Sequence, residues 1–107
     1  MAIRSSSVQR TAPEGVGYSV VSVADDTTTV NTGATNFYGL YVNSAIGENL
    51  VIKDGTTTVF TVLAAALTAN TYLSFSDAGI RFGTSLVIDP DNASTETDLV
   101  VLWDTAA

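Results

Sequence analysis

The sequence contains neither cysteine nor histidine among its 107 residues. Disulfides and thiolate metal sites are therefore excluded, and the commonest general base and metal ligand is missing. A serine nucleophile has no histidine to activate it. The acidic residues lie in or beside predicted turns, whereas paired catalytic carboxylates normally occupy a deep cleft. We expect no enzymatic activity and no cofactor.

Basic residues are scarce, because four Lys or Arg stand against eleven Asp or Glu, which gives a formal net charge of −7 at pH 7. Phosphate groups repel such a chain, so nucleic acid is not an expected partner. Apolar runs are short, and none is long enough to cross a bilayer. The first ten residues lack the apolar run of a signal peptide. We expect no membrane partner.

Helical periodicity is absent as well, since no ten-residue segment repeats its apolar positions with a period of about 3.6. Valine and threonine, which strands favour, are abundant, and turn residues recur about every 8 to 12 positions. The pattern predicts one all-β domain over residues 15–107, a single β-sandwich of about eight strands with jelly-roll or Greek-key connections. Residues 1–14 are polar and predict an extended N-terminal arm.

The strongest strand signal lies in residues 38–62, which read as three strands and two turns. A two-residue loop, Asp54-Gly55, and a three-residue loop that begins at Lys53 both fit the second turn. The longer loop is preferred, because it gathers the larger apolar set on one side and places Gly55 where a left-handed backbone is needed. The side chains on that side are Leu50, Ile52, Phe60 and Val62.

Other strands are predicted over residues 18–24, 28–31, 71–75, 80–88 and 98–103. The strand over residues 80–88 is interrupted at Gly83, where we expect a bulge. Residues 63–70 predict a crossing loop with room for one helical turn. The residues expected to form the core are Leu40, Val42, Leu50, Ile52, Phe60, Val62, Ile80, Phe82, Leu86, Ile88, Val101 and Trp103.

One acidic cluster offers the oxygen ligands that calcium prefers, with Asp89, Asp91 and Asn92 close together and Glu96 and Asp98 nearby. The spacing differs from that of an EF-hand loop. Asp, Pro and Asn are also the residues of an ordinary β-turn. We prefer the turn and expect no metal.

The four tyrosines and the single tryptophan fall in predicted strands. They are Tyr18, Tyr38, Tyr41, Tyr72 and Trp103. They form a sugar-stacking surface or, as we prefer, are ordinary strand residues, some in the core and some at an interface. Arg81 either pairs with a carboxylate such as Asp77 or Asp98, which we prefer, or faces a subunit boundary. Tyr41 and Arg81 are candidate interface residues.

The segment YGLYVNSAIGENLVIKDGTTTVFTV at 38–62 is followed by TYLSF at 71–75, GIRF at 79–82 and TSLVI at 84–88. In these motifs the chain resembles small virion proteins of tailed bacteriophages, especially marine and cyanobacterial phages, and among them capsid decoration (cement) proteins. The resemblance covers residues 38–88 and consists of strand and turn motifs. It implies a β-sandwich that forms a homotrimer and has no catalytic residues.

The resemblance also implies a location on the virion, at capsomer junctions on the outer capsid surface, with the major capsid protein as partner. A protein that binds the assembled shell but not its parts stabilises the shell. The alternative is a receptor- or glycan-binding β-sandwich module of a phage fibre or head appendage. A glycan site predicts aromatic and amide side chains around one exposed groove.

The arm holds two of the four basic residues, Arg4 and Arg10, together with the apolar residues Ile3 and Val8. We expect it to leave its own sandwich and to lie on a neighbouring subunit or on the shell. There the arginines would pair with carboxylates, and the two apolar side chains would fill shallow pockets. A frayed terminus is the alternative.

Overall fold

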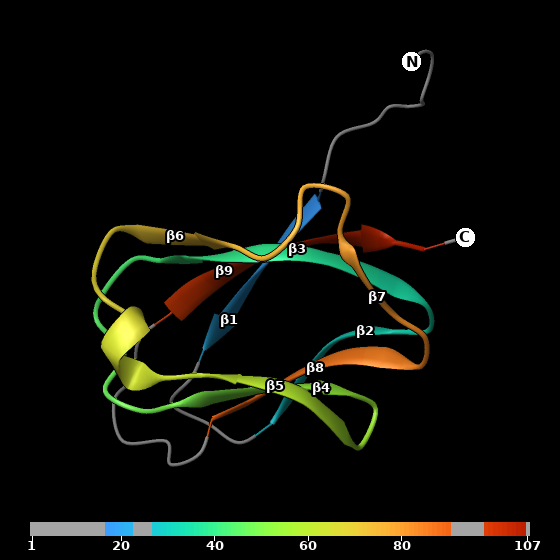
Figure 1. Cartoon of the computed structure of the whole chain (residues 1–107), viewed down its shortest axis with the longest axis horizontal. Coiled ribbons are helices and arrows are strands. Elements are labelled where there is room, and N and C mark those ends of the chain that lie inside the picture. Colours follow the sequence, from blue (N-terminus) through green and yellow to red (C-terminus); the bar gives the residue numbers. More distant parts are fainter. Residues whose placement is uncertain (1–16, 23–26, 91–97, 107) are drawn as a thin grey trace.

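Nine strands in two antiparallel sheets form the part of the chain that the computed structural model describes, residues 17–22, 27–90 and 98–106. The strands are β1 (Gly17–Ser22), β2 (Thr28–Thr32), β3 (Thr35–Val42), β4 (Leu50–Asp54), β5 (Thr57–Val62), β6 (Thr71–Ser74), β7 (Ile80–Phe82), β8 (Ser85–Pro90) and β9 (Asp98–Thr105). A single 3-10 turn among these residues, η1 (Ala64–Ala66), joins β5 to β6, in agreement with the predicted crossing loop. Figure 1 shows the two sheets as stacked layers.

The strand order is that of a jelly roll. One sheet has the order β1, β9, β3, β6, with β7 pairing the first half of β3, and the other has the order β2, β8, β4, β5. With β7 set aside, each position of one sheet matches a position of the other that is filled by a strand adjacent in sequence: β1 and β2, β9 and β8, β3 and β4, β6 and β5. Two four-stranded sheets connected in this way form the eight-stranded jelly roll, so the predicted β-sandwich is confirmed.

The prediction of one strand over residues 80–88 is wrong. β7 belongs to the five-stranded sheet and β8 to the four-stranded sheet, so Gly83 and Thr84 carry the chain from one layer to the other. The alternation of apolar residues continues on both sides of the crossing, because each strand turns its apolar side to the same core. The sequence pattern alone therefore does not reveal the change of sheet.

The turn between β4 and β5 consists of Gly55 and Thr56, which is neither of the predicted loops. A register shift next to Ile52 adds one residue to β5 and restores the alternation. The four residues predicted to share a side therefore still do so, and Gly55 has the expected left-handed backbone, with φ of 63°.

Most of the predicted core residues are buried, and Phe60, Ile80 and Trp103 are partly buried against the core. The prediction missed Phe37, which is fully buried, because it placed the start of the strand at Tyr38. Phe37 and Leu40 both point inward, since the register of β3 on β9 shifts between Phe37 and Gly39. The prediction also missed the buried residues Val21, Ile46, Leu67 and Leu99.

Candidate functional site

Two rows of uncharged residues cover the outward-facing side of the five-stranded sheet. Facing residues of antiparallel strands share a side of the sheet, so the register assigns each row. One row consists of Val20, Val100, Tyr41 and Tyr72, on β1, β9, β3 and β6 in that order. The second row consists of Tyr18, Leu102, Gly39 and Ser74, on the same strands. We call these two rows the uncharged band.

The band holds most of the exposed large hydrophobic side chains of the described residues. Tyr18 is 70% exposed, Val20 59% and Tyr72 49%, and the remaining two, Val59 and Leu63, belong to β5 and the residue after it. Single exposed apolar residues are normal, whereas a contiguous set with a polar rim marks a contact surface. The band is contiguous, because each row joins cross-strand neighbours.

The β6 end of the band is closely packed around Gly39. A Cβ atom there would collide with the carbonyl oxygen of Leu73 and lie 3.0 Å from a ring carbon of Tyr72. Glycine therefore allows the Tyr72 ring to lie over β3. Beside it, the Tyr41 hydroxyl donates a hydrogen bond of 3.4 Å to Oδ1 of Asn70, which has a left-handed backbone with φ of 58°.

A polar row closes the band at one end. Asp104 of β9 faces Asn36 of β3, and Asn36 faces Arg81 of β7. Asp104 accepts hydrogen bonds from the Asn36 amide at 3.0 Å and from the Tyr38 hydroxyl at 2.9 Å. Simple alternation along β3 would place Tyr38 on the inward side with Leu40, but the register shift between Phe37 and Gly39 puts it on the outward side with Asn36. This rim has one charge of each sign, on strands that flank β3.

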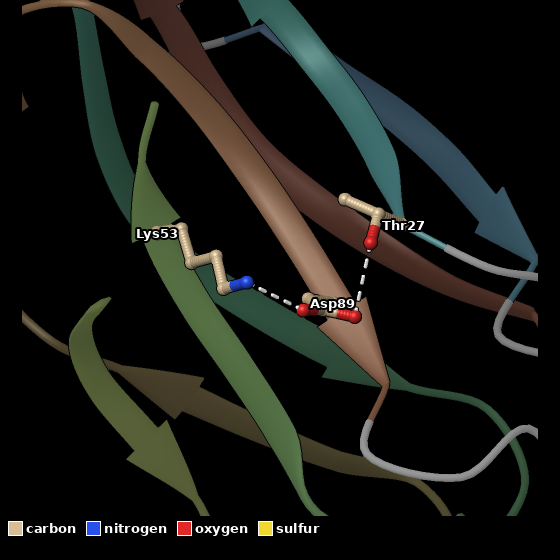
Figure 2. Close-up of polar contacts among 3 residues, drawn as sticks. All are labelled: Thr27, Lys53 and Asp89. Carbon is tan, nitrogen blue, oxygen red and sulfur yellow. Dashed lines mark hydrogen bonds and ion pairs between the residues drawn. The ribbon is translucent and has the colours of Figure 1, made fainter. Parts of the chain in front are cut away.

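The outward-facing side of the four-stranded sheet is more polar, although it also includes Val51 and Val87, neither of which is exposed. Asp89 of β8 lies between Lys53 of β4 and Thr27, the residue before β2 (Figure 2). Lys53 Nζ is 2.7 Å from Asp89 Oδ2, and the Thr27 hydroxyl donates to Asp89 Oδ1 over 3.0 Å. The hydrogen bond from Lys53 is the main cause that lowers the pKa of Asp89, and the bond from Thr27 lowers it further. Thr29 and Thr61 are exposed on the same side.

Asp54, the last residue of β4, fixes the crossing between the sheets. Its carboxylate accepts hydrogen bonds from the backbone N–H groups of Gly83 (3.0 Å), Thr84 (2.8 Å) and Ser85 (3.2 Å). The bond from Thr84 is the largest cause that lowers the pKa of Asp54, and the other two N–H groups and the charge of Arg81 add to it. Through this contact, Asp54 positions the chain just after β7, which supplies the rim residue Arg81.

The two described residues that were predicted at an interface, Tyr41 and Arg81, lie in the band and at its rim. The aromatic residues do not share one surface, since Trp103 faces the core side and donates from Nε1 to Ser19 Oγ over 2.9 Å. Sequence reasoning missed Val20, Val100 and Leu102 as surface residues. Their signal was the run of apolar residues at consecutive positions in residues 20–21 and 99–103, which gives a strand two apolar sides.

Other predicted residues fall outside the described part of the chain. They are Ile3, Arg4, Val8 and Arg10 of the arm and Asp91, Asn92 and Glu96 of the acidic cluster. Asp89 of that cluster belongs to β8 and forms the ion pair with Lys53. Among the described residues, no group of three or more metal-ligating side chains comes together.

No pocket is found on the described surface, and the band rises from adjacent strands of one sheet. No helix in the described ranges is long and apolar enough to cross a membrane. Comparisons with known protein families, curated proteins and solved structures find no match for this chain.

Proposed function

We propose that the protein is a structural virion protein, a capsid decoration protein that binds the outer surface of a phage head at capsomer junctions and stabilises it. The observation that carries this proposal is the uncharged band, since a contiguous exposed apolar surface with a polar rim is typical of protein contacts. Tyrosine is enriched and Lys, Asp and Glu are depleted at the centre of such contacts. The resemblance of residues 38–88 names the partner, the major capsid protein.

The contrast between the two outer faces supports the proposal. A trimeric decoration protein needs one surface for its sister copies and another for the shell. One face of this sandwich has the uncharged band, and the other has an ion pair and exposed threonines. Many symmetric copies would multiply a modest affinity for the shell. The jelly roll itself occurs in both viral capsid and lectin domains, so it supports the proposal only by analogy.

A second candidate, a glycan-binding module of a phage appendage, is favoured by one local feature. Tyr41 and Tyr72 are cross-strand neighbours in the band, and the Asn70 amide touches the Tyr41 hydroxyl. Two aromatic rings and an amide are what a sugar-binding surface uses. A glycan array followed by titration of any hit tests this candidate, and Tyr72→Ala should abolish the binding if the candidate is correct.

The decisive experiment for the proposal is a density map of the intact particle of the phage that encodes this chain. We expect the chain at symmetric positions on the outside of the head. Heads that lack the chain should lose integrity at a lower temperature, and added full-length protein should restore the original value. Density for the chain only in the tail or a fibre, or particles that contain no copy of it, would overturn the proposal.

A further inference from the structure

We infer that the uncharged band is occupied by a second copy of this chain, and that copies associate around an axis parallel to the strands. In this arrangement the β1–β9 half of one band contacts the β3–β6 half of the next. The inference deepens the proposed function and rests on it for the number of copies, which is three. The contact between two bands is argued from the surface itself.

The charge of the chain indicates which partner binds the band. The chain has a net charge of −7, so two copies repel each other, and a contact that brings their carboxylates together increases the repulsion. Neither row of the band contains a formal charge. Two acidic copies therefore approach with the least repulsion through this surface. A basic partner would instead be recognised by carboxylates, because interfaces match opposite potentials.

The rim is complementary to its own copy. Arg81 lies on β7, at the β6 side of the sheet, and Asp104 lies on β9, toward the β1 side. When copies are related by an axis parallel to the strands, the β6 side of one copy contacts the β1 side of its neighbour. Arg81 is then directed to the Asp104 of its neighbour, while Tyr72 of one copy packs near Val20 and Tyr18 of the next.

The size of the band sets the expected strength of the contact. A stable interface buries about 800 Å² on each partner. Two rows across four strands supply the apolar centre of such an interface, and the rim must supply the remainder. Tyrosines at the centre contribute most to such contacts. We therefore expect association with a dissociation constant on the order of micromolar.

Two matched substitutions test the inference by light scattering and sedimentation of the full chain. Val20 of β1 is 59% exposed in the band, and Val59 of β5 is 44% exposed on the other sheet. Val20→Lys and Val59→Lys change the net charge equally, and both lower its magnitude, so general repulsion does not explain a difference between them. We expect the unsubstituted chain and Val59→Lys to show about three times the monomer mass of 11.1 kDa. Val20→Lys should raise the dissociation constant roughly 30-fold or more.

Tyr72→Lys, on the opposite half of the band, should weaken association in the same way and replaces Val20→Lys if that variant fails to fold. A monomeric unsubstituted chain at about 100 µM, far above the expected constant, would overturn the inference. Association of Val20→Lys and Tyr72→Lys at the original strength would also overturn it.

Binding to phage heads separates this inference from the proposed function. If these variants stay associated but no longer bind phage heads, the band faces the shell, and the inference fails while the proposed function stands. If they are monomeric and the phage particle contains no copy of the chain, the proposed function fails and the contact between copies stands.

Discussion

The two outward-facing sides of the sandwich are built from the same kind of strand but differ in chemistry. On the four-stranded sheet, inward-pointing apolar residues alternate with threonines, with the Lys53–Asp89 pair, and with Val51 and Val87, neither of which is exposed. On the five-stranded sheet, β1 and β9 have apolar residues at consecutive positions, so both of their sides are apolar. The apolar residues on the inward side of β1 and β9 are explained by the core, whereas those on the outward side require a second explanation.

This difference has an energetic meaning. Burial stabilises by about 25 cal/mol for each Å² of apolar surface removed from water, and an exposed tyrosine or valine leaves that contribution unused. Tyr18 and Val20 leave it unused at one edge of this face, and Tyr72 leaves it unused at the other edge. The four-stranded sheet has less of this reserve. Among its described residues only Val59 is an exposed large hydrophobic side chain, and the threonines and the ion pair are already compatible with water. The comparison therefore predicts that association depends on one face and not on the other.

The largest expected effect is at the core that both faces share. Phe37 of β3 is fully buried, and its ring lies 5.4 Å from that of Phe75, 5.8 Å from Phe82 and 6.3 Å from Phe60, centroid to centroid. We expect Phe37→Ala to lower the free energy of unfolding by about 3–5 kcal/mol, a large part of the stability of a small domain. Urea denaturation followed by Trp103 fluorescence measures it.

Phe60→Ala is the matched change on the four-stranded sheet. Phe60 is only partly buried, so its removal should cost less than that of Phe37. An equal or larger loss for Phe60→Ala would show that the two sheets do not contribute to the core as their burial suggests.

Much of this fold was predictable from the sequence, because strand alternation and turn residues are local signals. The side shared by Leu50, Ile52, Phe60 and Val62 was predicted correctly even though the turn was not, since a bulge in β5 compensates for the shorter loop. The crossing at Gly83 was not predictable, because it is fixed by Asp54, about thirty residues earlier in the chain. Phe37 was missed for a similar reason, since the bulge beside it reverses the alternation.

The candidate surface was only partly predictable. Tyr41 and Arg81 were identified from residue type, but the rows in the band depend on the pairing of β1 with β9 and of β9 with β3. These pairings join residues that are far apart in the sequence, such as Val20 with Val100 and Tyr41 with Val100. Local patterns do not contain that information.

The second effect in size concerns the crossing that positions the rim of the band. Asp54→Asn removes the charge that accepts three backbone N–H bonds. Two of these bonds are exposed to water, so we expect a loss of about 0.5–1.5 kcal/mol at neutral pH. The pKa of Asp54 is lowered in the folded state, so its stabilisation is fully present above the usual value of 3.8 and is lost as the pH falls through the lowered pKa. The stability difference between the two proteins should therefore shrink in acid. A difference that grows in acid would contradict this role.

A smaller effect is expected on the polar face. Lys53 and Asp89 are each 27% exposed at the side chain, and such pairs contribute about 0.2–1 kcal/mol. A double-mutant cycle with Lys53→Met and Asp89→Asn should give a coupling energy in this range, and added salt should reduce it. Neither variant should change self-association. If either one dissociates the copies, the polar face is the contact and the comparison is reversed.

The smallest effect on folding is expected from removal of the arm, which lies outside the described residues. Deleting residues 2–12 should leave the stability and self-association of the domain unchanged, because the band belongs to the sandwich. Binding to phage heads should weaken, by about 0.2–1 kcal/mol for each exposed pair made by Arg4 or Arg10. Added salt should weaken head binding of the full chain, because salt screens the attraction of the arginines for carboxylates. It should not weaken the contact between copies, because there salt also screens the repulsion between acidic chains.

The full-length variant Arg4→Gln/Arg10→Gln separates the effect of charge from the effect of arm length. If the truncated chain binds heads as well as the full chain, the arm is a frayed terminus. If it becomes monomeric, the arm and not the band joins the copies.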